Sequence, residues 1–90
     1  MDLKNMTIII TGGARGIGAA LATRFAKEGA KVVVADLDEG AARATAAVID
    51  GLAVACDVTK EADVQALVQQ AEQHFGPVDM FCSNAGVCLG

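Results

Sequence analysis

The 90-residue sequence has no tryptophan and no tyrosine, and it has one proline and one histidine. With His74 as the only histidine, a Cys/His zinc site would need ligands without any recognisable spacing, so we expect no bound metal. The three cysteines, Cys56, Cys82 and Cys88, are odd in number and form no C-x-x-C pair. This usage is typical of small buried thiols in a cytoplasmic protein.

Basic residues are also scarce, because 7 Lys and Arg stand against 11 Asp and Glu, for a net charge of -4. That sign excludes a sequence-independent interaction with nucleic acid phosphates or anionic membranes. No apolar run approaches the roughly 20 residues of a membrane span, and the N-terminus has no basic segment followed by an apolar one. The length suffices for one small domain only.

Apolar runs rich in β-branched residues alternate with segments of helical period, which predicts βαβ units around a buried parallel sheet. We expect strands at residues 6–11, 31–36, 52–56 and 78–82. We expect one helix from residue 16 to Gly29, a second over 41–49 capped by Asp38, and a third capped by Thr59 and ended by Gly76-Pro77. The predicted fold class is α/β, a Rossmann-type doubly wound parallel sheet with about four strands and three helices.

Two helices show a periodic apolar face that predicts contact with the sheet. In the first helix this face is Ile17, Leu21 and Phe25. In the third it comprises Val64, Leu67, Val68, Ala71 and Phe75. The fourth strand should lie beside the first, and its other edge, over 80–82, should be bare and prone to pairing or aggregation.

The most informative motif is the glycine-rich turn between the first strand and the first helix, over residues 11–18. Gly12 supplies a tight turn, Gly16 lets the backbone approach a pyrophosphate, and Gly18 lets helix and strand pack closely. The helix N-terminus offers free N–H groups to an anion. Because glycines weaken helices and strands, an empty glycine-rich turn is the less favoured interpretation.

An acid follows the glycines at the distance typical of a dinucleotide site. Asp36 ends the second strand, where its carboxylate can accept hydrogen bonds from both ribose hydroxyls of an adenosine, or can instead cap the following turn. A 2′-phosphate there would be repelled by about 4 kcal/mol per unit charge at ~4 Å and an effective dielectric near 20. Leu37 adds no cation, whereas Arg15 is the one residue that argues for a phosphate, although it could equally be a solvated surface arginine. NAD is therefore predicted over NADP.

Together these residues resemble the short-chain dehydrogenase/reductase family, whose T-G-x-x-x-G-x-G spacing matches residues 11–18. The resemblance implies that Asp57 and Val58 contact the adenine and that the segment Asn84, Ala85 and Gly86 supports the sheet beside the adenosine ribose. Ser83 stands where the family usually has a second Asn. From the residues alone, Asp57 could equally be a helix-capping acid and Asn84 a turn residue. The cofactor-binding set is Gly12, Arg15, Gly16, Ile17, Gly18, Asp36, Leu37, Asp57, Val58, Asn84, Ala85 and Gly86.

The resemblance covers only the first half of such an enzyme. The family's catalytic Tyr-x-x-x-Lys and serine are absent, since the chain has no tyrosine and its one serine, Ser83, belongs to the turn. No catalytic residue is therefore assigned. Residues 1–90 are predicted to be the NAD-binding half-domain of an alcohol/carbonyl oxidoreductase that is a homo-oligomer in its complete form and binds its small-molecule substrate only in that form.

Three other functions are weighed against this one. A non-catalytic dinucleotide-binding or regulatory module is the alternative that the missing tyrosine favours. A methyltransferase fits less well, because Thr11 and the 84–86 segment have no place in it. A P-loop NTPase is excluded, because the turn lacks the Gly-Lys-Ser/Thr sequence that binds phosphate and magnesium.

Overall fold

The computed structural model describes residues 2–83 and 87–90, which form five strands and three helices. In chain order the elements are β1 (Thr7–Thr11), α1 (Gly16–Lys27), β2 (Lys31–Asp36), α2 (Glu39–Ile49), β3 (Leu52–Ala55), α3 (Glu61–Phe75), β4 (Met80–Ser83) and β5 (Val87–Leu89). The four predicted strands and three predicted helices are present, with bounds that shift by one or two residues at most ends.

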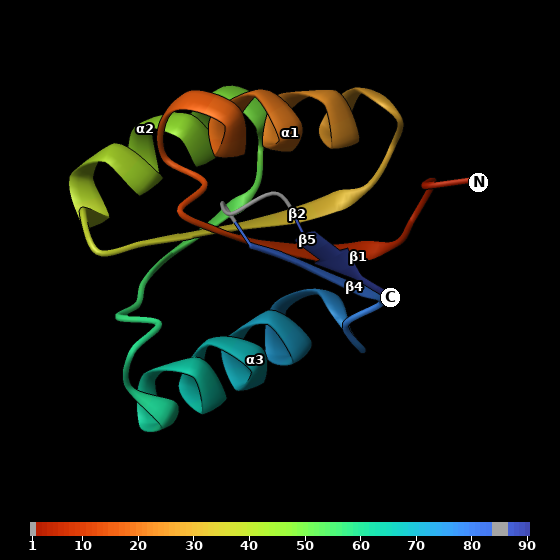
Figure 1. Cartoon of the computed structure of the whole chain (residues 1–90). Helices are drawn as coiled ribbons and strands as arrows, with labels where there is room; N and C mark the ends of the chain where they lie inside the picture. The colour runs from red at the N-terminus through yellow and green to blue at the C-terminus, as the bar shows by residue number, and fades with distance from the viewer. Residues whose placement is uncertain (1, 84–86) are drawn as a thin grey trace.

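The strands form one sheet in the order β3-β2-β1-β4-β5, in which the first four strands are parallel. In the centre Ile9 pairs with Val33 of β2 on one side and with Phe81 of β4 on the other. Helices α1 and α2 cover one face of the sheet and α3 covers the other (Figure 1). This arrangement confirms the Rossmann-type α/β class and the predicted contact between β4 and β1.

The core has two halves because successive residues of a strand point to opposite faces. Under α1 and α2 the strands contribute Ile8, Ile10, Val32 and Val34, which pack with Ala22, Ala42 and Ala46 of the helices. Under α3 they contribute Ile9, Val33, Ala35 and Val54, which pack with Leu67 and Ala71. The predicted apolar face of α3 is confirmed, since Val64, Val68 and Phe75 pack against this second cluster.

The predicted apolar face of α1 is wrong at its first residue. Ile17 is 68% exposed, whereas Gly18 and Ala22 are the buried residues of the helix. Leu21 and Phe25 are partly buried against the core, as expected. Ile17 lies in the first turn of a helix that starts beyond the end of β1, so its side chain has no strand beneath it.

Three of the four predicted helix ends are confirmed, including Gly76, which ends α3 with φ +105. Asp38 caps α2 by accepting a hydrogen bond from the Ala41 N–H at 3.0 Å. Gly29 follows α1 with φ +90, a value that favours glycine. The prediction that Thr59 caps α3 is wrong: the helix begins at Glu61, and the Thr59 hydroxyl donates to Asp57 instead.

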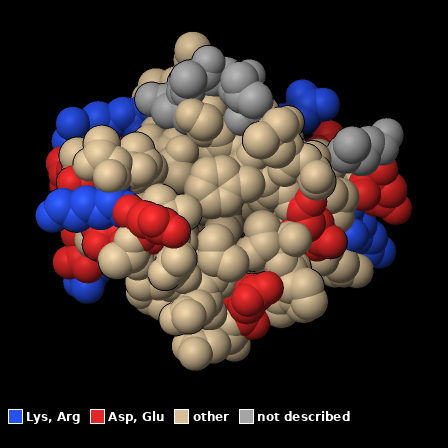
Figure 2. Space-filling model, turned by 60° about the horizontal axis from the view of Figure 1, so that its bottom comes forward, with Lys and Arg blue, Asp and Glu red and all other residues tan. Residues whose placement is uncertain are grey.

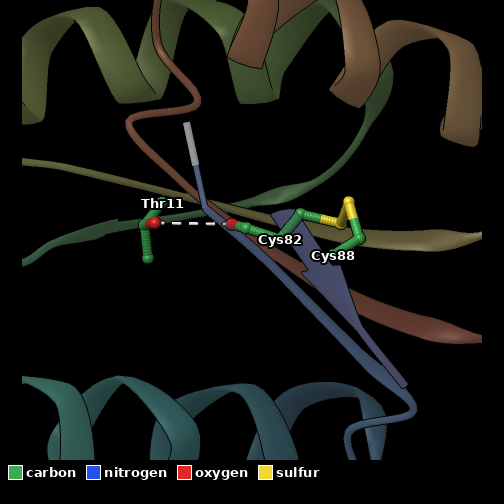
Figure 3. Close-up of a disulfide and its surroundings, with 3 residues drawn as sticks. All are labelled: Thr11, Cys82 and Cys88. Atoms are coloured by element: carbon green, nitrogen blue, oxygen red, sulfur yellow. Dashed lines mark hydrogen bonds between the residues drawn. A yellow bond between two sulfur atoms is a disulfide. The ribbon is translucent and has the colours of Figure 1, made fainter. Parts of the chain in front are cut away.

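The outer edge of β4 is not bare, which corrects a second prediction. The three-residue strand β5 pairs with it antiparallel, placing Phe81 opposite Leu89 and Cys82 opposite Cys88. Those two cysteines form a disulfide (Figure 3), so the prediction of three free thiols is also wrong. Cys56 alone is a free, buried thiol. In a doubly wound sheet a further parallel strand would pair with β4. Here β5 pairs with it instead and satisfies backbone N–H and C=O groups of β4.

The surface on the α3 side carries few charges near its middle. Figure 2 shows a broad uncharged area there, with acidic and basic side chains gathered mostly toward its margins. Among residues 2–83 and 87–90, no helix is both long and apolar enough to cross a membrane.

Candidate functional site

The glycine turn has the backbone geometry that its sequence predicts. Gly12 and Gly16 have φ values of +65 and +57, in the left-handed region that residues with a Cβ rarely adopt. A Cβ on Gly18 would collide with the carbonyl oxygen of Gly12 and lie 2.9 Å from the Cα of Gly13. A Cβ on Gly16 would meet nothing within 4 Å. Gly18 therefore serves packing, while Gly16 leaves open space in front of the turn.

Three hydrogen bonds hold the turn against its neighbours. The Gly13 N–H donates to the Ala35 carbonyl at 3.2 Å, and the Ala14 N–H donates to Oδ2 of Asp36 at 3.3 Å. The Thr45 hydroxyl of α2 donates to the Ala14 carbonyl at 2.9 Å. Sequence reasoning missed Thr45, because no local signal links it to a turn 31 residues earlier.

The N-terminus of α1 faces the open side of the turn. Arg15 is the N-cap residue with an extended backbone, and its side chain makes no capping hydrogen bond. No acidic residue lies in the first helical turn. The first N–H groups of a helix have no partner within it and carry the positive end of the helix dipole. This end of α1 has the chemistry to accept an anion.

Asp36 points toward the glycine turn rather than away from it. Its Oδ2 accepts the Ala14 N–H, and its Oδ1 accepts the N–H of Asp38 at 3.1 Å. The side chain is only partly buried. The carboxylate of Asp36 therefore sits between the turn after β1 and the turn after β2, at the carboxyl ends of two adjacent parallel strands.

Arg15 forms an ion pair with Asp38, in which its Nη2 lies 2.6 Å from Oδ2. The two side chains are 75% and 48% exposed. Sequence reasoning identified Arg15 as a candidate for phosphate contact and Asp38 as a helix cap, and it did not connect them. The pair joins the residues that precede α1 and α2.

Asp57 lies just beyond the end of β3. The residue before it, Cys56, donates its N–H to the Asp36 carbonyl of β2 at 3.0 Å. Oδ1 of Asp57 accepts both the hydroxyl and the N–H of Thr59, at 2.6 and 3.0 Å. The Thr59 hydroxyl is the main reason that the pKa of Asp57 is lowered. Burial raises the pKa of the Cys56 thiol, with smaller contributions from Asp63 and Asp57.

Large apolar side chains are exposed after the first three strands. Leu37 is 73% exposed and Val58 57%, and Ile17 in the first turn of α1 is also exposed. Leu37 and Val58 follow neighbouring parallel strands, β2 and β3. Apolar residues exposed at this edge of the sheet can contact a flat apolar group such as a purine ring.

The structure thus brings most of the predicted site residues to one edge of the sheet. The glycine turn follows β1, Asp36 ends β2 with Leu37 next to it, and Asp57 and Val58 follow β3. Asn84, Ala85 and Gly86, predicted to complete the site, lie outside the described residues. Crevices at the carboxyl ends of parallel strands are where open α/β sheets bind ligands.

The sheet order and the glycine turn define a half of a Rossmann-type α/β fold. The family described as short chain dehydrogenase matches residues 6–90. The chain belongs to this family.

Relatives of this chain include the short-chain dehydrogenase reductase ATA1 of Arabidopsis thaliana, which is 52% identical over 81 residues, covering 90% of this chain and 30% of that protein. A 3-ketoacyl-(acyl-carrier-protein) reductase from Brucella melitensis, solved in complex with NADH, is 47% identical with a TM-score of 0.85, covering 88% of this chain and 34% of that one. A short chain dehydrogenase/reductase from Burkholderia phymatum in complex with NAD is 35% identical with a TM-score of 0.86, covering 90% and 31%. The chain spans about a third of the length of these proteins.

Proposed function

We propose that the chain is the NAD(H)-binding portion, residues 1–90, of a short-chain dehydrogenase that acts on an alcohol or carbonyl substrate. The observation that carries the proposal is the orientation of Asp36, whose carboxylate faces the glycine turn through the Ala14 N–H. Relatives solved with NADH and with NAD support a nicotinamide dinucleotide as the ligand. When bound, the nicotinamide supplies the hydride chemistry.

The residues present fit the adenosine diphosphate part of this ligand. The open space at Gly16 and the uncapped N-terminus of α1 would hold the diphosphate, with Gly12, Ile17 and Gly18 shaping the turn. Asp36 would accept hydrogen bonds from the ribose hydroxyls. The exposed side chains of Leu37 and Val58 would contact the adenine, with Asp57 beside them. Asn84, Ala85 and Gly86 would line the ribose as the family resemblance implies.

Acid/base catalysis is assigned to no residue of this chain. The proposal therefore includes a Tyr-x-x-x-Lys region beyond residue 90 of the complete protein, and with it the small-molecule substrate and a homo-oligomeric, cytoplasmic enzyme. In the cytoplasm, thiol-reducing systems would convert Cys82 and Cys88 to free thiols, so an enzyme located there would lack this disulfide.

The test is a calorimetric titration of NADH into the chain and into Asp36→Ala. Because charge-assisted hydrogen bonds contribute about 1.5–3 kcal/mol each, the substitution should weaken NADH binding by about tenfold or more. Glu72→Ala is the control, because this exposed acid lies on α3 on the opposite face of the sheet. Equal NADH affinity in all three proteins would remove Asp36 from the site, and no NADH binding by the unmodified chain would refute the proposed function.

A further inference from the structure

Asp38 has three contacts that fix its carboxylate between two turns. Its N–H donates to Oδ1 of Asp36 at 3.1 Å, its Oδ1 accepts the Ala41 N–H at 3.0 Å, and its Oδ2 lies 2.6 Å from Nη2 of Arg15. The first two contacts belong to the turn after β2 and hold Asp38 without any help from Arg15. The position of Asp38 is therefore set by its own turn, and the Arg15 side chain extends to its carboxylate.

Arg15 is the only Lys or Arg in the glycine turn over 11–18 and in the turn over 36–41. A phosphate on the 2′-hydroxyl of a ribose bound at Asp36 would lie among the side chains of these two turns. Arg15 is then the one cation in either turn that could neutralise it. Within the described structure, that cation is paired with Asp38.

We propose that Asp38 is a specificity-determining residue that favours NAD(H) by holding Arg15 in an ion pair. The inference rests on the proposed function. It makes Asp38 a second acidic residue, besides Asp36, that disfavours NADP(H) relative to NAD(H). An incoming 2′-phosphate meets the carboxylate of Asp36 and finds Arg15 already paired with Asp38. To use Arg15, the phosphate must break the ion pair and leave Asp38 as an unpaired negative charge nearby.

The experiment is a titration of NADH and NADPH into the unmodified chain, Asp38→Asn, Arg15→Ala and the double variant. Asparagine caps a helix as well as aspartate does, so Asp38→Asn removes the charge and keeps the start of α2. Asp38→Ser, which also retains a capping oxygen, is a second variant of the same kind. Circular dichroism on each protein checks that the fold is intact.

Releasing Arg15 should tighten NADPH binding by about two- to fivefold at low salt, with NADH affinity unchanged. The gain should disappear in the double variant, because Arg15 then offers no charge to the phosphate. It should also shrink as the salt concentration rises.

Three results would count against the inference. An unchanged NADPH-to-NADH affinity ratio in both Asp38 variants would overturn it while leaving the proposed function intact. A gain that persists without Arg15 would show that Asp38 acts through its own charge and not through the ion pair. If the unmodified chain bound neither dinucleotide, the proposed function and this inference would fail together.

Discussion

Replacing Gly18 by alanine should destabilise the chain, although alanine is the better helix former. Gly18 lies in the first turn of α1, and a Cβ there would collide with the Gly12 carbonyl oxygen and approach the Gly13 Cα to 2.9 Å. Both contacts are with backbone, so no side chain can rotate away to relieve them. The start of α1 would have to move away from Gly12 and Gly13 of the turn, against which Gly18 packs.

The magnitude follows from two opposing contributions. Overpacking of this kind costs about 1–3 kcal/mol, and the helix propensity of alanine returns up to about 1 kcal/mol. We expect a net loss of about 1–2 kcal/mol in the free energy of unfolding, which lowers the midpoint of thermal unfolding by about 4–16 °C in a domain of this size.

Gly40→Ala is the matched control, because Gly40 also lies in the first turn of a helix. A Cβ there meets only Oδ1 of Asp38, at an ordinary contact distance of 3.6 Å. This variant should be as stable as the unmodified chain or more stable by up to about 1 kcal/mol. Urea unfolding followed by circular dichroism gives both values. A Gly18→Ala variant as stable as Gly40→Ala would refute the assignment of Gly18 to close helix–strand packing.

Two further predictions concern Asp57 and the cysteines. Thr59→Val should raise the pKa of Asp57 toward its ordinary value of about 3.9, measured by NMR titration of the carboxyl carbon, because the hydroxyl that stabilises the carboxylate is lost. A lowered carboxyl pKa stabilises the folded state above the unfolded-state pKa, and this stabilisation is lost as the pH falls through the folded-state pKa. The unmodified chain and Thr59→Val should therefore become equally stable in acid. An unchanged pKa of Asp57 in the variant would contradict the assignment. Reducing the Cys82–Cys88 disulfide, which spans a sequence separation of 6, should lower the free energy of unfolding by about 2 kcal/mol, and equal stability of the two redox forms would argue against a structural role.

Local patterns predicted the elements well where each residue's environment is set by its neighbours in the chain. The uncharged run over 32–35 gave a central strand, and residues 32–35 are all buried between α-helical layers. Predictions made at element ends were less successful. Ile17 fits the helical period of α1 but lies past the end of the sheet, and Thr59 has a capping side chain but donates to Asp57 before the helix begins. Periodicity says which residues share a face, and it does not say how far that face extends.

The candidate site shows the same division. Gly12, Gly16, Gly18 and Asp36 could be selected from spacing, because a turn with positive φ values requires glycine and because parallel strands present their carboxyl ends at one edge. The pairing of Arg15 with Asp38 could not be predicted, since both residues had plausible separate roles and their contact depends on how two turns 23 residues apart approach each other.

The sequence alone determined that this chain forms alternating strands and helices with a glycine-rich turn after the first strand, because β-branched runs, helical periods and glycine conformations are local properties. Only the tertiary structure decided that Asp36 faces that turn, that Arg15 is held by Asp38, and that a short antiparallel strand joined by a disulfide covers the edge of β4. These contacts join side chains and strand edges whose relative positions are fixed by the packing of the whole sheet, and no local pattern encodes that packing.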